Sequence, residues 1–267
     1  MSPRSETAEG NIDSASIPKQ YCAQVSANYN EDPIGSAPGH HTYLLVEVPL
    51  PWHHQVEQSV HFPNGLNDLL QQAAERGRKF RFLSFASDML ASPRGWRRVI
   101  SYRKAGSPFA RFCKKEYIVP EQAVNGLAES LLEDRSAVSF EEYEVHTDGV
   151  RDLFVCTHGS HDVCCGKFGY PMYKEIEQRY TDVEDANVRV WRTSHFGGHR
   201  HAPTLLELPD GRYWAQLKPE LLDALLLRKG DVRQLSRHYR GWSGLSAFEQ
   251  VAERAAFMEQ GWAWDRY

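Results

Sequence analysis

The segment from Cys156 to His199 restricts what this chain can fold into more than any other part of the sequence. It holds three of the five cysteines and four of the twelve histidines. Cys156 precedes the doublet Cys164-Cys165, and His195 and His199 follow about thirty residues later. Thiolate and imidazole ligands suit zinc or an iron–sulfur centre and suit magnesium or calcium poorly. The fold must therefore bring two short segments together around a soft-metal site.

The predicted elements occur twice in the same order, which is strand, helix, strand, hairpin and helix. The first set covers 43–48, 66–74, 80–85, 97–103 paired with 110–119 across a turn at 106–108, and a helix that opens at Pro120. The second set covers 153–155, a helix that opens at Pro171, 187–193, 205–208 paired with 213–217, and a helix that opens at Pro219. Apolar spacing and Gly/Pro punctuation indicate these elements. The order is typical of a thioredoxin-like fold, so we expect an α/β protein with tandem thioredoxin-like domains.

This organisation divides the chain into four parts. We expect a disordered leader at 1–18, a thioredoxin-like domain without cysteine ligands at 19–145, a second thioredoxin-like domain that carries the metal-binding loops at 146–230, and a C-terminal helical tail at 231–267. Ser246 followed by Glu249 predicts a capping box at the start of a helix in the tail. The first-domain loop at 50–63 offers His53, His54 and His61 but no cysteine. That loop is typical of a histidine-rich surface, with a weak transition-metal site as the alternative.

Charge and hydropathy restrict the partners and the compartment. A net charge of −4 gives no basic field for a polyanion, so we expect no nucleic-acid partner. No apolar run approaches the roughly 18 residues that a membrane span needs, so we expect no membrane partner. The first residues lack the apolar core of a secretory signal, and Glu6, Glu9 and Asp13 argue against an organelle presequence. We therefore expect a cytoplasmic location, where grouped cysteines are more often metal ligands or redox groups than disulfides. Cys22 and Cys113 stand alone in the sequence, and we expect both to be buried as small apolar residues.

Ligand spacing separates zinc chemistry from iron–sulfur chemistry. The histidine pair has zinc-finger spacing, but the eight residues between Cys156 and Cys165 exceed the two to four usual in a structural zinc site. A binuclear iron–sulfur cluster fits better, because each iron needs two protein ligands and the two irons can draw on separate loops. A zinc-stabilised binding module remains an alternative. A thiol–disulfide oxidoreductase that uses Cys156 and the doublet is another, although the compact C-x-x-C motif is absent and the histidine pair would have no role.

Several stretches carry a resemblance to a known family. They read CTHGSHDVCCGKFGYPM and VWRTSHFGGHRHAPTLLELPDG in the second half, YCAQVSANYNEDPIGSA and LLVEVPLPW upstream, and YRGWSGLSAFEQVAE downstream. These stretches resemble the sucrase/ferredoxin-like family, and the resemblance covers most of the chain after residue 20. Members of that family are thioredoxin-like ferredoxins whose 2Fe–2S cluster has two cysteine and two histidine ligands.

The resemblance implies a ligand set and a group of neighbours. The ligands would be Cys156, Cys165, His195 and His199, and Cys164 would be the non-ligand member of the doublet. Candidate supporting residues are Cys164, Gly166, Ser194, Gly198, Arg200 and His201. His201 stands where the family usually has an aromatic residue, and we expect it to be either a proton acceptor near the cluster or an exposed neighbour.

The implied function is proton-coupled, one-electron transfer to or from a redox protein. Two ferric ions, two sulfides and two thiolates sum to zero charge, so the potential should lie above that of plant-type ferredoxins. Each imidazole ligand keeps one titratable nitrogen, so electron transfer should depend on pH. We therefore expect a ferredoxin-type electron carrier and not a hydrolase. A glycosidase needs two carboxylates across a sugar cleft, whereas Glu141, Glu142 and Glu144 form a charge run typical of a solvated face.

Overall fold

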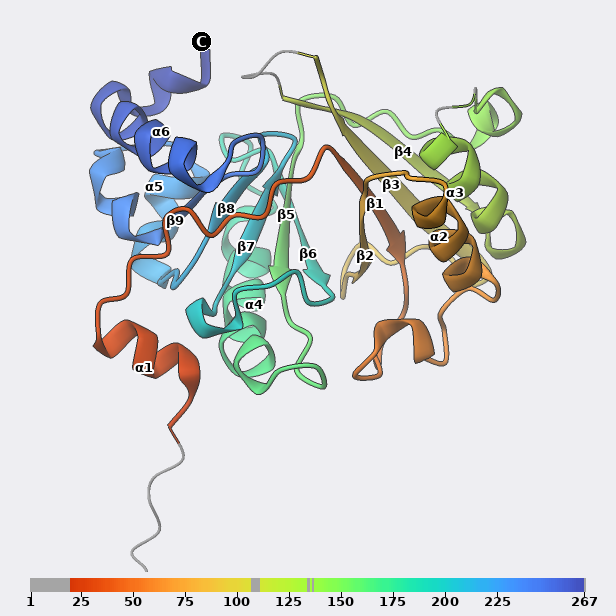
Figure 1. Ribbon diagram of the computed structural model, residues 1–267, viewed down its shortest axis with the longest axis horizontal. Helices are drawn as coiled ribbons and strands as arrows, with labels where there is room; N and C mark the ends of the chain where they lie inside the picture. The colour runs from red at the N-terminus through yellow and green to blue at the C-terminus, as the bar shows by residue number, and fades with distance from the viewer. Residues whose placement is uncertain (1–19, 107–110, 134, 136, 267) are drawn as a thin grey trace, which may run out of the picture.

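The computed structural model describes residues 20–106, 111–133, 135 and 137–266 (Figure 1). The leader expected at 1–18 lies outside these residues, as do positions 107 and 108 of the first hairpin turn. Within the described part of the chain, no helix is long and apolar enough to cross a bilayer.

The described strands form one mixed sheet of nine in the order β4-β3-β1-β2-β6-β5-β7-β8-β9. Their bounds are β1 Thr42–Glu47, β2 Arg81–Ala86, β3 Trp96–Lys104, β4 Phe112–Pro120, β5 Arg151–Cys156, β6 Val188–Thr193, β7 Leu205–Leu208, β8 Arg212–Trp214 and β9 Tyr239–Trp242. The α-helices are α1 Cys22–Asn28, α2 Leu66–Glu75, α3 Val124–Glu133, α4 Tyr170–Tyr180, α5 Leu222–Leu226 and α6 Ala247–Gln260. Every strand and helix expected from the repeated order is present, with shifts of a few residues at the ends.

The two halves of the chain build their parts of the sheet with the same strand order. In the first half, β1 lies between a parallel β2 and an antiparallel β3, and β4 follows β3. In the second half, β5 lies between a parallel β6 and an antiparallel β7, and β8 follows β7. The halves join through a short antiparallel pairing of β2 with β6, at Phe85↔Thr193 and Ala86↔Arg192. The protein is therefore a mixed α/β structure in which one sheet runs through both halves.

Each half has its own apolar core under its helices. In the first half, α2 and α3 cover a core that includes Leu44, Leu66 and Leu127. In the second half, α4 and α5 pack on Leu153 and neighbouring residues. Figure 1 shows α2 and α3 beside the β1–β4 part of the sheet and α5 and α6 at the opposite end of the molecule.

A third core joins the two halves. Side chains alternate between the faces of a strand, and Phe154 lies on the opposite face from Leu153. On that face Phe85 contacts both Phe154 and Trp191, with ring centroids 6.1 Å and 5.1 Å from its own. Cys156 is two residues after Phe154 and belongs to the same shared core. The last residue of β5 therefore points toward the face that both halves cover.

The region after residue 230 differs from the expected helical tail. Helix α6 has the predicted capping box of Ser246 and Glu249, and Trp262 and Trp264 pack against the core of the second half. However, Tyr239–Trp242 form β9, which pairs with β8 at the end of the sheet. A four-residue strand shows too little alternation to be recognised in the sequence. Helix α1 was not predicted from the sequence either. It precedes β1 in the chain but lies beside the second half of the molecule (Figure 1).

Candidate metal centre

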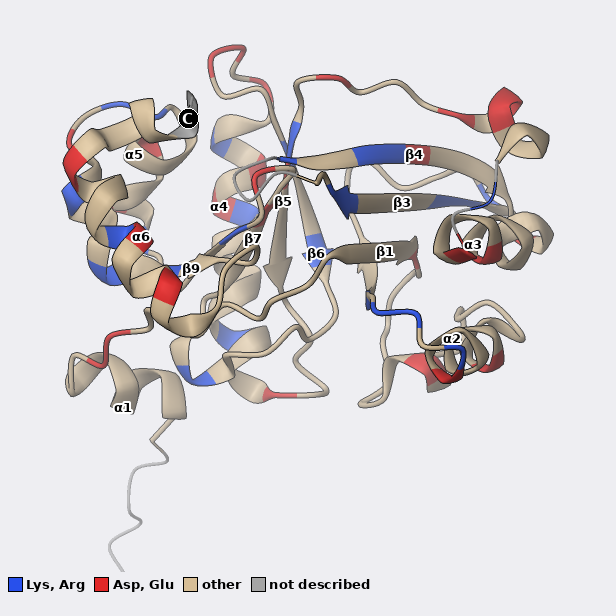
Figure 2. Cartoon of the chain, turned by 45° about the horizontal axis from the view of Figure 1, so that its top comes forward, with Lys and Arg blue, Asp and Glu red and all other residues tan. Residues whose placement is uncertain are grey.

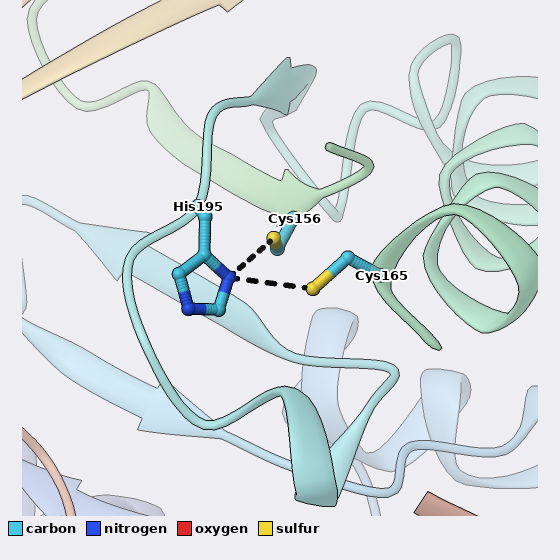
Figure 3. A group of neighbouring side chains, drawn as sticks. All are labelled: Cys156, Cys165 and His195. Carbon is cyan, nitrogen blue, oxygen red and sulfur yellow. Dashed lines mark hydrogen bonds between the residues drawn. The ribbon is translucent and has the colours of Figure 1, made fainter. Parts of the chain in front are cut away.

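Two loops meet at the carboxyl ends of β5 and β6. Cys156 is the last residue of β5, Cys165 begins a π-helical turn that leads into α4, and His195 follows β6 by two residues. Because β5 and β6 are parallel neighbours, their carboxyl ends lie at the same edge of the sheet. Figure 3 shows the side chains of Cys156, Cys165 and His195 pointing toward one another from these loops.

The three side chains are close enough to bind one metal ion or metal cluster together. Nδ1 of His195 lies 3.4 Å from the Cys165 sulfur and 3.8 Å from the Cys156 sulfur. All three candidate ligand atoms lie within 4.8 Å of one another. Both cysteines are buried, at 1% exposure each. His195 therefore presents Nδ1 to a buried pair of thiols and leaves Nε2 on the other side of its ring.

His199 lies at the rim of this group and not within it. Its ring centroid is 5.8 Å from that of His195, and its side chain is 47% exposed. Its Nδ1 is 3.6 Å from Oδ2 of Asp162, on the cysteine loop. The structure thus brings three of the four expected ligands together and holds the fourth at the solvent-exposed edge.

The two members of the cysteine doublet have different neighbours. Cys165 faces His195, whereas the sulfur of Cys164 lies 3.1 Å from the sulfur of Cys22 in α1. The expectation that Cys22 and Cys113 are buried was wrong, because both are exposed. Cys22 lies in the first turn of a surface helix, and Cys113 lies on β4, at one end of the sheet.

The two facing thiols have opposite pKa shifts. Burial raises the pKa of Cys156, but hydrogen bonds with Cys165 and His195 outweigh burial and lower that pKa to about 5. The hydrogen bond with Cys156 and burial raise the pKa of Cys165 above its ordinary value. The pair therefore holds one negative charge readily and a second one only with a counter-charge such as a metal ion.

Glycines allow the cysteine loop to pack tightly. A Cβ at Gly169, the residue before α4, would lie 1.9 Å from the carbonyl oxygen of Cys156. A Cβ at Gly166 would lie 2.8 Å from the Cα of Gly159. Only glycine fits such distances, so the start of α4 rests directly on the end of β5.

Arg240 supports the histidine loop from β9. It is 3% exposed and donates hydrogen bonds to the carbonyl oxygens of Gly197, at 3.2 Å, and Ser36, at 2.7 Å. Gly198 has φ +83°, and a Cβ there would lie 2.7 Å from the guanidinium. Sequence analysis missed this role, and the only signal for it was that Arg240 lies within the stretch YRGW that resembles the family.

Comparison with known proteins identifies the family. The sequence profile of the sucrase/ferredoxin-like family matches residues 33–241. The chain belongs to the sucrase/ferredoxin-like family.

The individual proteins that the chain resembles have low sequence identity to it and match only part of it. Altered inheritance of mitochondria protein 32 from Meyerozyma guilliermondii is 27% identical over 115 residues, which span 40% of this chain and 39% of the relative. Two solved structures of a thioredoxin-like [2Fe-2S] ferredoxin from Aquifex aeolicus are 21% and 17% identical. Each covers 32% of this chain, against 88% and 94% of the ferredoxin chains, with a TM-score of 0.27.

The other expected supporting residues tie the histidine loop of this family member to its surroundings. Ser194 exchanges hydrogen bonds with Ser84 of β2, since its N–H donates to the carbonyl at 2.8 Å and its Oγ accepts from the N–H at 3.0 Å. Arg200 forms an ion pair with Glu31. His201 is only 8% exposed, so the alternative of an exposed neighbour was wrong. Its Nδ1 lies 3.0 Å from Oγ of Ser26, which shows that α1 packs over this turn.

The histidine-rich loop of the first half contacts the cysteine loop of the second half. Nε2 of His158 donates to the carbonyl of His53 at 2.8 Å, and Nδ1 of His161 donates to the carbonyl of His54 at 3.1 Å. The ring of His161 stacks with that of His54, at 4.8 Å between centroids, and with that of His195, at 4.4 Å. The loop expected to be a histidine-rich surface is therefore also part of the wall beside the candidate ligands.

Proposed function

We propose that this protein is a one-electron carrier that holds a 2Fe–2S cluster through Cys156, Cys165, His195 and His199. The observation that carries the proposal is the grouping of two buried thiols and the imidazole of His195 within 4.8 Å, on two loops far apart in sequence. Membership of the sucrase/ferredoxin-like family supports it.

The donor set suits this group. Each iron of a binuclear cluster needs two protein ligands, so the cysteines would hold one iron and the histidines the other. When bound, such a cluster accepts and donates a single electron. The cysteines keep their side of the site away from water, and His199, at 47% exposure, would be the ligand nearest to a docked redox protein. The nitrogen of each histidine that does not face iron can carry a proton, which would make the transfer proton-coupled.

The proposal includes a division of the chain into domains and a cellular compartment. Residues 146–230 would be the thioredoxin-like ferredoxin domain, and 19–145 a clusterless thioredoxin-like domain that serves as scaffold. The matching strand orders of the two halves support this division. The donor and acceptor would be redox proteins in the cytoplasm, and cell fractionation with an antibody to the chain would test that location.

Metal analysis of anaerobically purified protein tests the function. We expect two iron and two acid-labile sulfide per chain, and an electron paramagnetic resonance signal that appears after one-electron reduction. Adjacent cysteines provide a matched pair of variants. Cys165→Ser should lose the iron, whereas Cys164→Ser should retain it, because the Cys164 sulfur faces Cys22. Iron-free, colourless wild-type protein would reject the proposal, and one zinc ion per chain would favour a zinc-stabilised binding module.

A thiol–disulfide oxidoreductase is the second candidate function. It is favoured by the contact between the Cys156 and Cys165 thiols, which lie within 4.8 Å of each other. In this reading one thiol would attack a substrate disulfide and the other would resolve the mixed disulfide. Trapping such a mixed disulfide in cluster-free Cys165→Ser protein, together with the absence of iron in the wild type, would favour it over electron transfer.

A further inference from the structure

A second pair of thiols lies outside the candidate ligand set. The sulfurs of Cys22 and Cys164 are 3.1 Å apart, although 142 positions separate them in the chain. A disulfide bond is about 2 Å long, so the two sulfurs need to approach by only about 1 Å. Cys22 is exposed and Cys164 is buried. A solute can therefore reach Cys22, whereas Cys164 is buried beside it.

Helix α1 connects this pair to both loops of the candidate metal centre. Tyr21, just before α1, makes an edge-to-face contact with Phe168 of the cysteine loop, at 5.9 Å between ring centroids. On the other side, Ser26 hydrogen-bonds His201 of the histidine loop at 3.0 Å. A covalent bond from α1 to Cys164 would therefore fix the helix next to Cys165 and over the turn that begins at His199.

We propose that Cys22 and Cys164 form a two-electron thiol/disulfide site that is separate from the one-electron site at Cys156, Cys165 and the histidines. The oxidant would be a small disulfide such as oxidised glutathione. The Cys22 thiolate attacks one sulfur of that disulfide, which releases one glutathione thiol and leaves a mixed disulfide on Cys22. The Cys164 thiolate then attacks the Cys22 sulfur and releases the second glutathione. Two protein thiols lose two electrons and two protons in total, and one glutathione disulfide becomes two thiols.

The surroundings of Cys22 set the expected rate of this step. Burial of its sulfur and the neighbouring Cys164 raise the pKa of Cys22 to about 11. Only the thiolate attacks, so the reaction should be slow at neutral pH and accelerate by about tenfold per pH unit below that pKa. The site would respond to sustained oxidising conditions and would not react at once with traces of oxidant.

Peptide mapping of the purified full-length protein tests this inference. Reduced protein is exposed to oxidised glutathione at pH 7 and pH 9, alkylated and digested with trypsin. We expect a cross-link between the peptide 20–76, which contains Cys22, and the peptide 152–167, which contains Cys164. The link should form about a hundredfold faster at pH 9 than at pH 7. Amide hydrogen exchange within α1 should slow after oxidation, because the disulfide restrains the helix.

Variants assign the link and provide the controls. Cys22→Ser and Cys164→Ser should each abolish the cross-linked peptide and the change in hydrogen exchange, while Cys113→Ser should keep both. Absence of the link in wild-type protein, or its persistence in Cys164→Ser, would overturn the inference. Zinc retained by the wild type and lost in Cys22→Ser, without a cross-link, would also overturn it and indicate a metal site of Cys22, Asp162 and Cys164. The mapping does not depend on iron, so a failed cluster proposal and a failed disulfide proposal give different results.

Discussion

At the scale of single residues, the two histidines of the candidate centre have unequal surroundings. His195 presents Nδ1 to two buried sulfurs, and His199 lies half in solvent beside Asp162. Sequence spacing predicted both residues as a pair, because ligand type and spacing are local properties. It could not show that one is enclosed and the other exposed, since exposure depends on which loops pack around them.

Replacing either histidine by cysteine tests its role as a ligand. In His195→Cys and His199→Cys a thiolate would replace a neutral imidazole, so the cluster becomes more negative and its potential should fall by on the order of 100 mV or more. The pH dependence of the potential should also weaken, because one titratable imidazole is gone. Redox titration at several pH values measures both effects. The exposed His146→Cys is the control and should leave both unchanged, and an unchanged potential in either ligand variant would argue against iron binding at that position.

At the scale of elements, the start of α4 shows how backbone packing builds the site. Pro171 predicted this helix correctly, and the alternation in 187–193 predicted β6, because both signals lie within the element itself. The close approach of Gly169 to Cys156 has no such signal. It depends on how the start of α4 docks on the end of β5, and Cys156 precedes Gly169 by thirteen residues in the sequence.

Gly169→Ala should displace the cysteine loop. The added Cβ would lie 1.9 Å from the carbonyl oxygen of Cys156, so α4 must move away from β5. We expect a loss of about 1–3 kcal/mol in the free energy of unfolding, as for other overpacked sites, and weaker iron binding because Cys165 moves with the helix. Urea denaturation and iron analysis measure these effects. Gly126→Ala in α3 is the matched control: its Cβ would meet only Phe140, at 3.5 Å, so it should be neutral or stabilising by up to about 1 kcal/mol. Iron binding in Gly169→Ala at the wild-type level would contradict this account of the loop.

At the scale of the whole molecule, a buried network of charges joins the halves. Arg189 of β6 forms ion pairs with Glu116 of β4, at 2.7 Å, and with Asp152 of β5, at 2.8 Å. Lys114 bridges the same two carboxylates, at 2.7 and 2.6 Å. Figure 2 shows basic segments on β4 and β6, the strands that supply the two cations of this network. Two buried carboxylates and two partly buried cations hold the hairpin of the first half against the second half.

Because of this network, the free energy of unfolding should fall at acidic pH. Burial raises the pKa of Glu116, but Arg189 and Lys114 outweigh burial and hold that pKa well below the ordinary 4.5. A depressed native pKa stabilises the fold above about pH 4.5, and this contribution is lost as the pH falls further. Glu116→Gln should lower the free energy of unfolding at pH 7 by about 3–5 kcal/mol, because it removes one of the two carboxylates that Arg189 and Lys114 share. Its further loss of stability between pH 6 and pH 3 should be smaller than that of the wild type.

Urea denaturation across this pH range checks the prediction. Glu121→Gln is the control, because Glu121 is 44% exposed and pairs with Arg97 at 3.2 Å near the surface. Such pairs contribute about 0–1 kcal/mol, so this variant should follow the wild-type curve. Parallel pH curves for Glu116→Gln and the wild type would show that Glu116 does not titrate as described.

The sequence by itself determined the repeated order of strands and helices, the capping box at Ser246, and the residue types of the candidate centre. These follow from preferences that neighbouring residues impose on the backbone and from the chemistry of thiols and imidazoles. Only the tertiary structure decided that β2 pairs with β6, that Arg240 supports the histidine loop, and that Cys22 meets Cys164. Each of these contacts joins residues more than 40 positions apart, and the packing of the whole sheet selects such partners.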